Sequence, residues 1–527
     1  MHQSQRVSVA FMLAITSCAA AAPPKVDYLY PAGAQRGTSV EVTAAGTFER
    51  WPVKAWAEDK GIDVKPGKVN GKLTITVGPE VRPGVYGIRL FDEQGASIAR
   101  PFIVGTLPET LEKEPNDDPK KPHVLGKQNT IVNGRLEKPG DVDTFSVSLA
   151  KGQTLVASLE AHHTLRSPMD GVLQILSADG FVQEQNDDYH GFDPQIAFLA
   201  PKDGDYLVRV FAFPSAADSS IRFAGKENFV YRLALTAGPF VEYAYPLSVE
   251  RRKRFTIELV GWNIPDGDRT FSMFSRSESE SAKFFLAQSP NPFSIRLETN
   301  PTVVKTKATR KEPQAITLPV AISGRLDTPG DIDVYRFDAK KGQKLTFRID
   351  SRTLGFPLDP VLRLTDDAGK TLAQAKEAAI GADSSLDATA PQDGAYRIEV
   401  SDLHARGGMR FVYRLRAGPS APDFDLKVVD DRFTLSTGKP LEIPVTINRV
   451  GGYSQEITLS VEGLPKHVNA TSSAKGVSLR LSDDKTAFAG PIRIVGTSKD
   501  GTMRAAHATV ADLARNTDYL WLTVTSR

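Results

Sequence analysis

The chain contains a long internal repeat, and this repeat constrains its fold more than any other feature. Residues 132–157 read VNGRLEKPGDVDTFSVSLAKGQTLVA, and residues 322–347 read ISGRLDTPGDIDVYRFDAKKGQKLTF. Eleven of the 26 aligned positions are identical, at a constant offset of 190 residues. A second pair of segments, VDYLYP at 26–31 and VEYAYP at 241–246, precedes the two copies. A fixed long period predicts tandem modules that each fold around their own core.

Length and charge narrow the class of protein. A chain of 527 residues is too long for one hydrophobic core, and its length predicts about three to five domains. The formal net charge is +2 and is spread along the chain, apart from a short basic run at 305–311. Nucleic acid is therefore not an expected partner, because phosphate binding needs clustered lysines and arginines.

The N-terminus is typical of a secretory signal over residues 1–22. Arg6 supplies a positive charge, residues 7–15 form a short apolar core, and small residues follow at 17–22. The apolar core is too short to cross a membrane, and no other stretch approaches the ~18 apolar residues of a transmembrane segment. We therefore expect an exported protein, located outside the cell or in the cell envelope.

The single cysteine, Cys18, lies inside this signal. The sequence Ile-Thr-Ser-Cys at 15–18 resembles a bacterial lipobox, which would make Cys18 the site of a lipid anchor. The alternative is ordinary cleavage near residues 20–22, which would remove Cys18. In either case the folded part has no cysteine, so it has neither disulfides nor a thiolate metal site.

Most of the chain alternates apolar and polar residues in short segments separated by turn formers. Examples are SVEVTAAG at 39–46, KLTITVG at 72–78 and VYGIRLFD at 85–92. This pattern predicts an all-β protein built from antiparallel β-sandwich domains. The only helical hint, at 370–379, predicts a surface loop or a single turn.

The repeats and the turn positions together predict five sandwich domains after the signal, with boundaries near residues 107, 240, 306 and 420. They comprise an immunoglobulin-like domain (23–106), a first long repeat (107–240), a second immunoglobulin-like domain (241–306), a second long repeat (307–420) and a C-terminal immunoglobulin-like sandwich (421–527).

Each long repeat carries the same series of motifs. They are a G-D-x-D-x-[FY] strand at 140–145 and 330–335, a K-G-Q turn, a D-G-x-Y strand and a closing Y-R-L, and an EPNDD linker precedes the first copy. The series resembles the bacterial pre-peptidase C-terminal domain, a calcium-associated jelly-roll-like sandwich attached to secreted proteases and collagenases. The segments before the repeats resemble IPT/TIG-type immunoglobulin-like domains. The resemblance to the first family by itself implies no activity, because such domains accompany catalytic ones.

Oxygen-bearing side chains gather in the linker before the first repeat and at the entrance of its first long strand. Calcium takes about six to eight hard oxygen ligands. Residues two apart in a strand point the same way, so an acidic linker folded over an Asp-x-Asp entrance could supply them. The resemblance implies a calcium site of this kind, whose matching residues are Glu112, Glu114, Asn116, Asp117, Asp141 and Asp143. The alternative is a solvated acidic linker in which Asp141 only shapes a turn.

The second repeat is an internal control for this site. It keeps Glu312, Asp331 and Asp333, but its linker is the basic run at 305–311. In the sequence alignment Gln314 and Ala315 replace the linker Asn and Asp. Lysines in place of ligands repel Ca²⁺, so we expect calcium in the first repeat only.

Two common hydrolase motifs are absent from the sequence. It contains neither H-E-x-x-H nor G-x-S-x-G, and we expect His162, His163 and His190 to lie in surface loops. Tyr189, Phe192 and Phe213 either line a binding face for carbohydrate or peptide, or serve core and loop packing.

These observations predict a secreted or surface-anchored, non-catalytic protein that binds or spaces an extracellular protein or polysaccharide. A peptidase-associated chain with an unrecognised hydrolytic site is the rival interpretation. A purely structural component of the cell envelope is a third.

Overall fold

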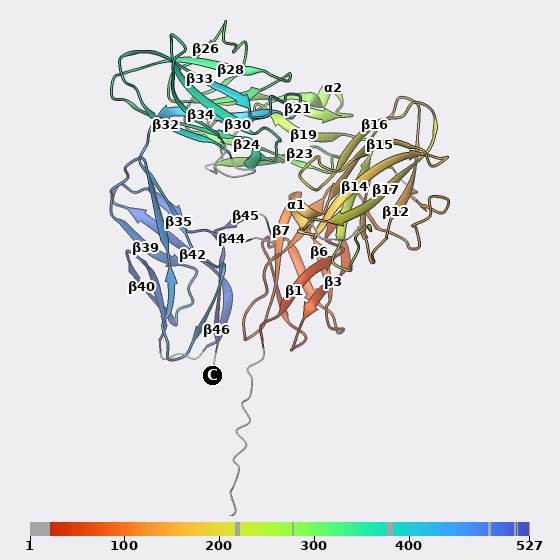
Figure 1. Ribbon diagram of the computed structural model, residues 1–527. Helices are drawn as coiled ribbons and strands as arrows, with labels where there is room; N and C mark the ends of the chain where they lie inside the picture. Colours follow the sequence, from red (N-terminus) through yellow and green to blue (C-terminus); the bar gives the residue numbers. More distant parts are fainter. Residues whose placement is uncertain are drawn as a thin grey trace, which may run out of the picture.

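The computed structural model describes residues 22–525, except 127, 217–221, 277–278, 377–382, 483–485, 511–512 and 514. Residues 1–21 of the expected signal, Cys18 among them, lie outside the described residues. Figure 1 shows an all-β chain of successive sandwiches. None of the helices in the described ranges is long and apolar enough to span a membrane.

The N-terminal sandwich consists of two four-stranded sheets, β1-β3-β6-β5 and β2-β8-β7-β4. Its strands are β1 (Lys25–Tyr30), β2 (Gly33–Gln35), β3 (Ser39–Thr47), β4 (Lys54–Ala57), β5 (Ile62–Pro66), β6 (Lys72–Val77), β7 (Gly84–Phe91) and β8 (Arg100–Gly105). The alternating segments of the sequence form β3, β6 and β7, as expected for strands with one buried face.

The first repeat contains ten strands and one helical turn. They are β9 (Glu109–Leu111), β10 (His123–Val124), β11 (Thr130–Arg135), β12 (Asp143–Leu149), β13 (Thr154–Glu160), α1 (His162–Leu165), β14 (Met169–Ser177), β15 (Val182–Asn186), β16 (Gln195–Leu199), β17 (Gly204–Pro214) and β18 (Val230–Thr236). They form two five-stranded sheets, β16-β13-β18-β11-β9 and β10-β12-β17-β14-β15.

The second repeat has the same number of strands in the same order. They are β25 (Thr302–Val304), β26 (Gln314–Ala315), β27 (Val320–Arg325), β28 (Ile332–Ala339), β29 (Lys344–Asp350), the 3₁₀ turn η1 (Arg352–Leu354), β30 (Pro360–Asp366), β31 (Thr371–Ala375), β32 (Ser385–Thr389), β33 (Gly394–Asp402) and β34 (Val412–Pro419). Its sheets are β25-β27-β34-β29-β32 and β26-β28-β33-β30-β31, so the two repeats share one topology, strand for strand.

The middle sandwich lies between the repeats and has two three-stranded sheets, β19-β21-β22 and β20-β24-β23. Its elements are β19 (Phe240–Tyr245), β20 (Ser248–Glu250), β21 (Arg254–Trp262), α2 (Asp266–Arg269), β22 (Thr270–Phe274), β23 (Ser281–Phe285) and β24 (Pro292–Glu298).

The C-terminal sandwich is built around the sheet β36-β46-β42-β39 and the sheet β37-β41-β40. Its strands are β35 (Asp423–Lys427), β36 (Arg432–Ser436), β37 (Leu441–Pro444), β38 (Thr446–Val450), β39 (Ile457–Glu462), β40 (Val468–Ser473), β41 (Gly476–Leu481), β42 (Phe488–Ser498), β43 (Met503–Ala505), β44 (Ala508–Val510), β45 (Arg515–Thr517) and β46 (Leu520–Thr525).

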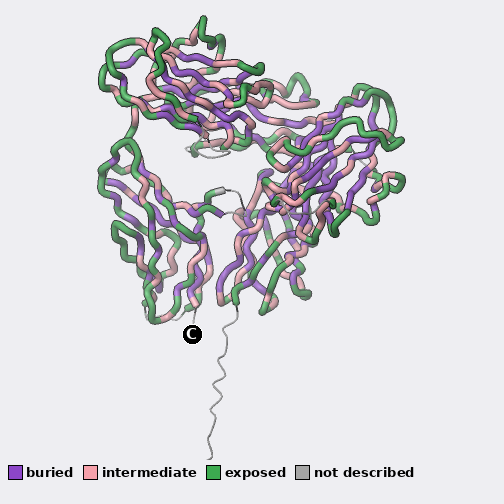
Figure 2. Tube along the Cα trace, viewed as in Figure 1, coloured by how far each residue is buried: buried purple, intermediate pink, exposed green. Residues whose placement is uncertain are grey.

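Five separate clusters of buried apolar side chains are each confined to one sandwich. Figure 2 shows this burial as purple tracts inside each sandwich and green loops around them. Burial within each module is what a tandem arrangement requires, because every sheet hides its apolar face against its own partner sheet.

Two local expectations are wrong. The segment at 370–379 is neither a loop nor a helical turn where it is described, because β31 pairs with β30 in a hairpin. The boundary expected near residue 306 lies too late, because β25 pairs with β27 of the second repeat. Short edge strands of this kind carry too few residues for a recognisable alternation.

The first and last sandwiches lie side by side, so the five domains form a closed arrangement (Figure 1). Arg89 on β7 and Asp431 form a buried ion pair across this contact, with 2.5 Å between Nη2 and Oδ2. The Trp521 ring packs against the rings of Trp56 and Phe91, at centroid distances of 5.7 and 4.9 Å. The sequence gives no sign of this closure, because its residues are more than 300 positions apart.

Candidate metal centre

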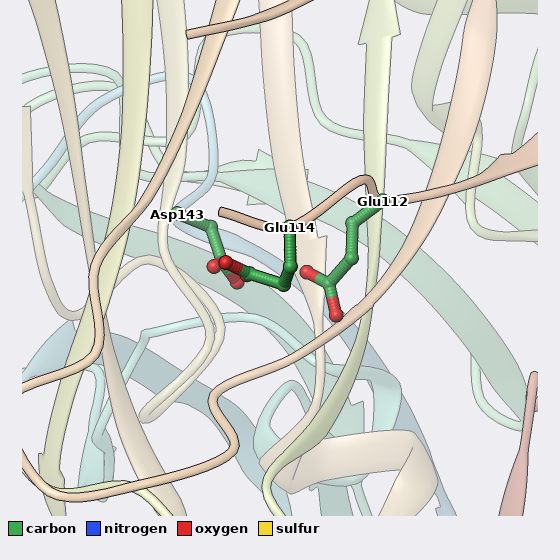
Figure 3. Close-up of side chains that lie close together, drawn as sticks. All are labelled: Glu112, Glu114 and Asp143. Atoms are coloured by element: carbon green, nitrogen blue, oxygen red, sulfur yellow. The ribbon is translucent and has the colours of Figure 1, made fainter. Parts of the chain in front are cut away.

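The linker after β9 brings carboxylates to the start of β12. β9 runs parallel to β11, and the next residue, Glu112, donates its backbone N–H to the carbonyl of Asn133 at 3.0 Å. The chain then crosses to the other sheet, where Asp143 begins β12. Carboxylate oxygens of Glu112, Glu114 and Asp143 come within 4.8 Å of one another (Figure 3).

Two tyrosine hydroxyls also reach this cluster. The hydroxyl of Tyr231 on β18 lies 2.5 Å from Asp143 Oδ2 and 3.1 Å from Glu112 Oε2, and it can donate to either. The hydroxyl of Tyr30, from the N-terminal sandwich, lies 3.3 Å from Glu112 Oε1. The backbone N–H of Arg135 donates to that same oxygen at 2.7 Å. Glu112 therefore lies at the joint between two domains.

Gly134 makes room for the buried Tyr231. A Cβ atom at position 134 would lie 2.1 Å from Tyr231 Cζ, far inside contact distance. The second repeat has the same arrangement, since a Cβ at Gly324 would lie 2.3 Å from Tyr413 Cζ. The glycine of the repeated G-R-L motif is thus explained by close packing against a tyrosine ring.

The other three predicted ligands lie beside the cluster and hold the linker to the sheet. The Asn116 side-chain oxygen accepts the N–H of Thr144 at 3.3 Å, and Asp117 accepts that of Val142 at 3.3 Å. Asp141 accepts the N–H of Glu137 at 2.5 Å. This contact shapes the turn before β12, which is the alternative role that the sequence predicts for Asp141. The structure thus brings three of the six predicted residues together and places the other three around them.

Burial dominates the electrostatics of the cluster. It raises the pKa of Glu112 to about 7, and together with the charge of Glu112 it raises the pKa of Asp143 well above its ordinary value. Burial and the neighbouring Asp117 raise the pKa of Asp141 to about 6. Such shifts mean that the charged forms lack sufficient compensation in this environment.

A hard cation fits this arrangement. The side chains of Asp141 and Asp143 are almost fully buried, and the Oδ1 atom of Asp143 has no hydrogen-bond partner. The Lys138 ammonium forms long ion pairs with Asp141 Oδ1 and Asp117 Oδ2, at 3.8 Å each. Within the described part of the chain, no Lys or Arg forms an ion pair with Glu112, Glu114 or Asp143. Buried carboxylates are normally paired or bound to a metal, and oxygen donors with excess negative charge are what Ca²⁺ prefers.

The second repeat has a lysine where the first has a glutamate. Lys305 follows β25 as Glu112 follows β9, and its N–H donates to the carbonyl of Ser323 at 2.9 Å. Its ammonium lies 2.7 Å from Asp333 Oδ1. Tyr413 donates to the other oxygen of Asp333 at 2.6 Å.

The structure corrects the alignment of the two linkers. Gln314 pairs beside Tyr335 as His123 pairs beside Phe145, so Gln314 and Ala315 correspond to β10 rather than to Asn116 and Asp117. The carbonyl of Ala308 instead takes the place of the Asn116 amide, accepting the N–H of Val334 at 2.6 Å. Gaps hide this equivalence in the sequence, because the second linker is shorter.

His162, Phe192 and Phe213 of the first repeat pack against other aromatic rings. His162 lies in α1, half-buried against the Phe192 ring at a centroid distance of 4.9 Å, and His163 is exposed in the same turn. Phe213 is 41% exposed and packs edge-on against Phe211 and Phe223.

His190 lies in the loop between β15 and β16, as expected, but its side chain is only 33% exposed, because the loop belongs to a junction of three domains. Arg410 of the second repeat stacks on Tyr189 at 4.1 Å, and its Nη2 lies 2.8 Å from His190 Nδ1. Its Nε lies 2.8 Å from Glu242 of the middle sandwich. Burial and the neighbouring Arg410 lower the pKa of His190 to about 3, so this imidazole is neutral.

Comparison with known proteins identifies the repeats. Residues 141–212 and 331–402 match the bacterial pre-peptidase C-terminal domain. A probable subtilase-type serine protease of Deinococcus radiodurans is 32% identical over 142 residues, which cover 27% of this chain and 18% of that protein. The chain therefore corresponds to less than a fifth of this relative.

Two solved structures of low sequence identity resemble parts of the chain. The pre-peptidase C-terminal domain of a Bacillus anthracis collagenase is 17% identical, covers 20% of this chain and 94% of its own, and has a TM-score of 0.17. The Aeromonas hydrophila inhibitor PliG, a periplasmic inhibitor of g-type lysozyme, is 18% identical, covers 20% and 96%, and has a TM-score of 0.16. On the family match and the shared topology, the two long repeats of this chain are members of the bacterial pre-peptidase C-terminal domain family.

Proposed function

We propose that this chain is an exported, non-catalytic scaffold that binds or spaces an extracellular protein or polysaccharide, and that calcium sets its first joint. The observation that carries the proposal is the position of Glu112. It contacts Tyr30 of the N-terminal sandwich while lying in a carboxylate cluster of the first repeat. A cation bound there would fix the linker and the angle between the two domains together.

The residues that would hold Ca²⁺ are Glu112, Glu114 and Asp143, with Asn116, Asp117 and Asp141 holding the linker around them. When bound, the ion would supply positive charge that the buried carboxylates lack. Tyr231 would orient Asp143 and Glu112 through its hydroxyl, and Arg135 would orient Glu112 through its backbone N–H. An export route is supported by the family of the repeats and by the expected signal, with Cys18 as a candidate lipid anchor.

A calcium titration of the full-length mature protein tests this proposal. We expect one binding site by calorimetry and a higher melting temperature of the first repeat. Binding to the folded form alone contributes about 2.7 kcal/mol at a hundredfold excess of calcium over Kd. Asp143→Asn should abolish both effects. Asp333→Asn, the same change at the equivalent position of the second repeat, is the matched control and should leave calcium binding intact. Calcium binding that survives Asp143→Asn would contradict the site.

A peptidase-associated role is the second candidate, and the partial match to a subtilase-type protease favours it. In our proposal the chain assists a protease or its substrate and does not cleave. A fluorophosphonate probe should therefore leave the mature protein unlabelled. Labelling that disappears on replacement of a single serine would establish the hydrolase interpretation instead. A binding screen against collagen, peptidoglycan and soluble glycans then identifies the class of partner.

A further inference from the structure

Lys305 and Glu112 occupy the same position in the two repeats. β9 pairs Leu111 with Asn133, and β25 pairs Val304 with Ser323, one repeat length away. The next residue in each linker donates its backbone N–H to that same carbonyl, at 3.0 Å in the first repeat and 2.9 Å in the second. The backbone therefore delivers a carboxylate to one site and an ammonium to the other.

The Lys305 ammonium is held by three oxygen groups. It forms an ion pair with Asp333 at 2.7 Å, lies 3.4 Å from Asp327 Oδ2, and donates to the carbonyl of Arg325. Only 13% of the Lys305 side chain and 4% of the Asp333 side chain are exposed. A long flexible lysine is rarely ordered in this way at a surface, so the contact ties the linker between β25 and β26 to the sandwich of the second repeat.

The first repeat offers the same three oxygen groups. Asp143 corresponds to Asp333, Glu137 to Asp327, and the carbonyl of Arg135 to that of Arg325 at the constant offset of 190 residues. Arg135 pairs with Glu137 as Arg325 pairs with Asp327. What the first repeat lacks is the tethered cation, because Glu112 stands in the place of the lysine.

We propose that the Lys305 ammonium is a built-in replacement for the metal ion, so that the linker of the second repeat is latched permanently and the linker of the first only when calcium is present. The residue at this single position would decide which of the two linkers responds to calcium. The part concerning Glu112 rests on the function proposed above. The part concerning Lys305 stands on the contacts of the second repeat alone.

Hydrogen–deuterium exchange on the full-length mature protein tests the second repeat first. Lys305→Met keeps the length of the side chain and removes its charge. We expect amide exchange in the 305–316 linker and in β27 to rise at least tenfold, with and without calcium. Lys307→Met is the matched control, because Lys307 is 85% exposed in the same linker and should leave exchange unchanged.

The reciprocal change transfers the latch to the first repeat. Glu112→Lys should place an ammonium beside Asp143, so the 112–123 linker should be as protected without calcium as the wild-type linker is with it. Calcium should then change nothing there. Glu112→Gln is the control that removes the charge without adding a cation, and its linker should exchange fast in both conditions.

The outcomes separate the two proposals. Unchanged exchange in Lys305→Met would overturn the latch in the second repeat. A Glu112→Lys linker as unprotected as that of Glu112→Gln would overturn the equivalence of the two positions. Loss of protection in Lys305→Met together with a wild-type first repeat that ignores calcium would support the lysine latch and reject the calcium site. Normal exchange in the N-terminal and C-terminal sandwiches shows in every variant that the chain is folded.

Discussion

At the scale of single residues, both repeats are built around a buried tyrosine that donates to a buried aspartate. Tyr231 contacts Asp143, and Tyr413 contacts Asp333. Each aspartate has a raised pKa because burial disfavours its charge. The repeats differ in what faces that aspartate, a cluster of carboxylates in one case and an ammonium in the other.

The first prediction at this scale concerns the glycine that packs against each tyrosine ring, Gly134 in the first repeat and Gly324 in the second. Gly134→Ala should destabilise the first repeat by about 3 kcal/mol, because its Cβ would overlap the Tyr231 ring and no shift can relieve it without moving the hydroxyl. Differential scanning calorimetry measures the loss as a lower melting temperature of that domain. Gly126→Ala is the control, since no atom lies within 4 Å of the new Cβ there. Equal melting temperatures for the two variants would contradict the packing argument.

The second residue-scale prediction concerns pH. Burial raises the pKa of Asp333 from 3.8 to about 6, while Lys305 opposes this rise. A carboxyl with a raised pKa binds more protons in the folded state, so its contribution to stability is present below pH 3.8 and is lost as the pH rises through 6. In Lys305→Met the pKa of Asp333 should rise further. The loss of folding stability with increasing pH should therefore be larger and should continue to higher pH.

We therefore expect the second repeat of Lys305→Met to be nearly as stable as wild type at about pH 5 and less stable by about 3 kcal/mol at about pH 8. Melting temperatures at the two pH values check this. A gap between variant and wild type that does not depend on pH would show that Asp333 is not the titrating partner.

At the scale of elements, the joint between each immunoglobulin-like sandwich and its repeat is built twice around an arginine. Arg232 on β18 pairs with Glu109 and Glu160, and Arg414 on β34 pairs with Glu298 and Asp350. The arginine has the same place in both Y-R-L motifs. One acidic partner differs in position: Glu109 lies on β9 of the first repeat, whereas Glu298 lies on β24 of the middle sandwich. In both cases two carboxylates neutralise the arginine, although one of them comes from a different element.

Breaking the second of these joints should be costly. Arg414→Met leaves Glu298 and Asp350 without their main partner, and we expect a loss of about 3 kcal/mol at the joint. Limited proteolysis between β24 and β25 should accelerate accordingly. Arg416→Met is the control, because Arg416 is 43% exposed and its contact with Asp350 is longer, at 3.5 Å. Similar cleavage rates in the two variants would argue against a stabilising role for the buried arginine.

The strands could be predicted from the sequence wherever alternation and turn residues coincide, as at β12 and β17. The acidic cluster was predictable in part, because Glu112, Glu114 and Asp143 carry oxygen donors within one short region. Tyr231 was not, since it lies 88 positions from Asp143 and reaches it only through the pairing of β18 with β11. The sequence shows that Lys305 lies in a basic linker. Its pairing with Asp333 could not be predicted, because the two linkers differ in length and the sequence alignment does not show which of their residues are equivalent.

At the scale of the whole molecule, the contact between the first and last sandwiches combines a buried ion pair with aromatic packing around Trp521. Asp431→Ala would leave Arg89, whose side chain is 3% exposed, without its partner. Removing one member of a buried pair costs about 3–5 kcal/mol. We expect the arrangement to open and the radius of gyration from small-angle X-ray scattering to increase.

Glu93→Ala is the control for this variant, because Glu93 is 74% exposed and its 3.5 Å ion pair with Arg50 lies within the first sandwich and contributes little. Domain melting temperatures should be nearly unchanged in both variants, since each sandwich keeps its own core. A radius of gyration that stays constant in Asp431→Ala would mean that the aromatic packing around Trp521 suffices to keep the domains together.

The closed arrangement also determines how the chain carries mechanical load. The two sandwiches in contact are the first and last of the five, so tension applied to the ends of the folded chain passes through their shared interface. We expect the middle sandwich and both repeats to carry little of that tension until the Arg89–Asp431 contact breaks. Stretched between a surface and a bound partner, the molecule would lengthen first by separating the first and last sandwiches and only later by unfolding a domain.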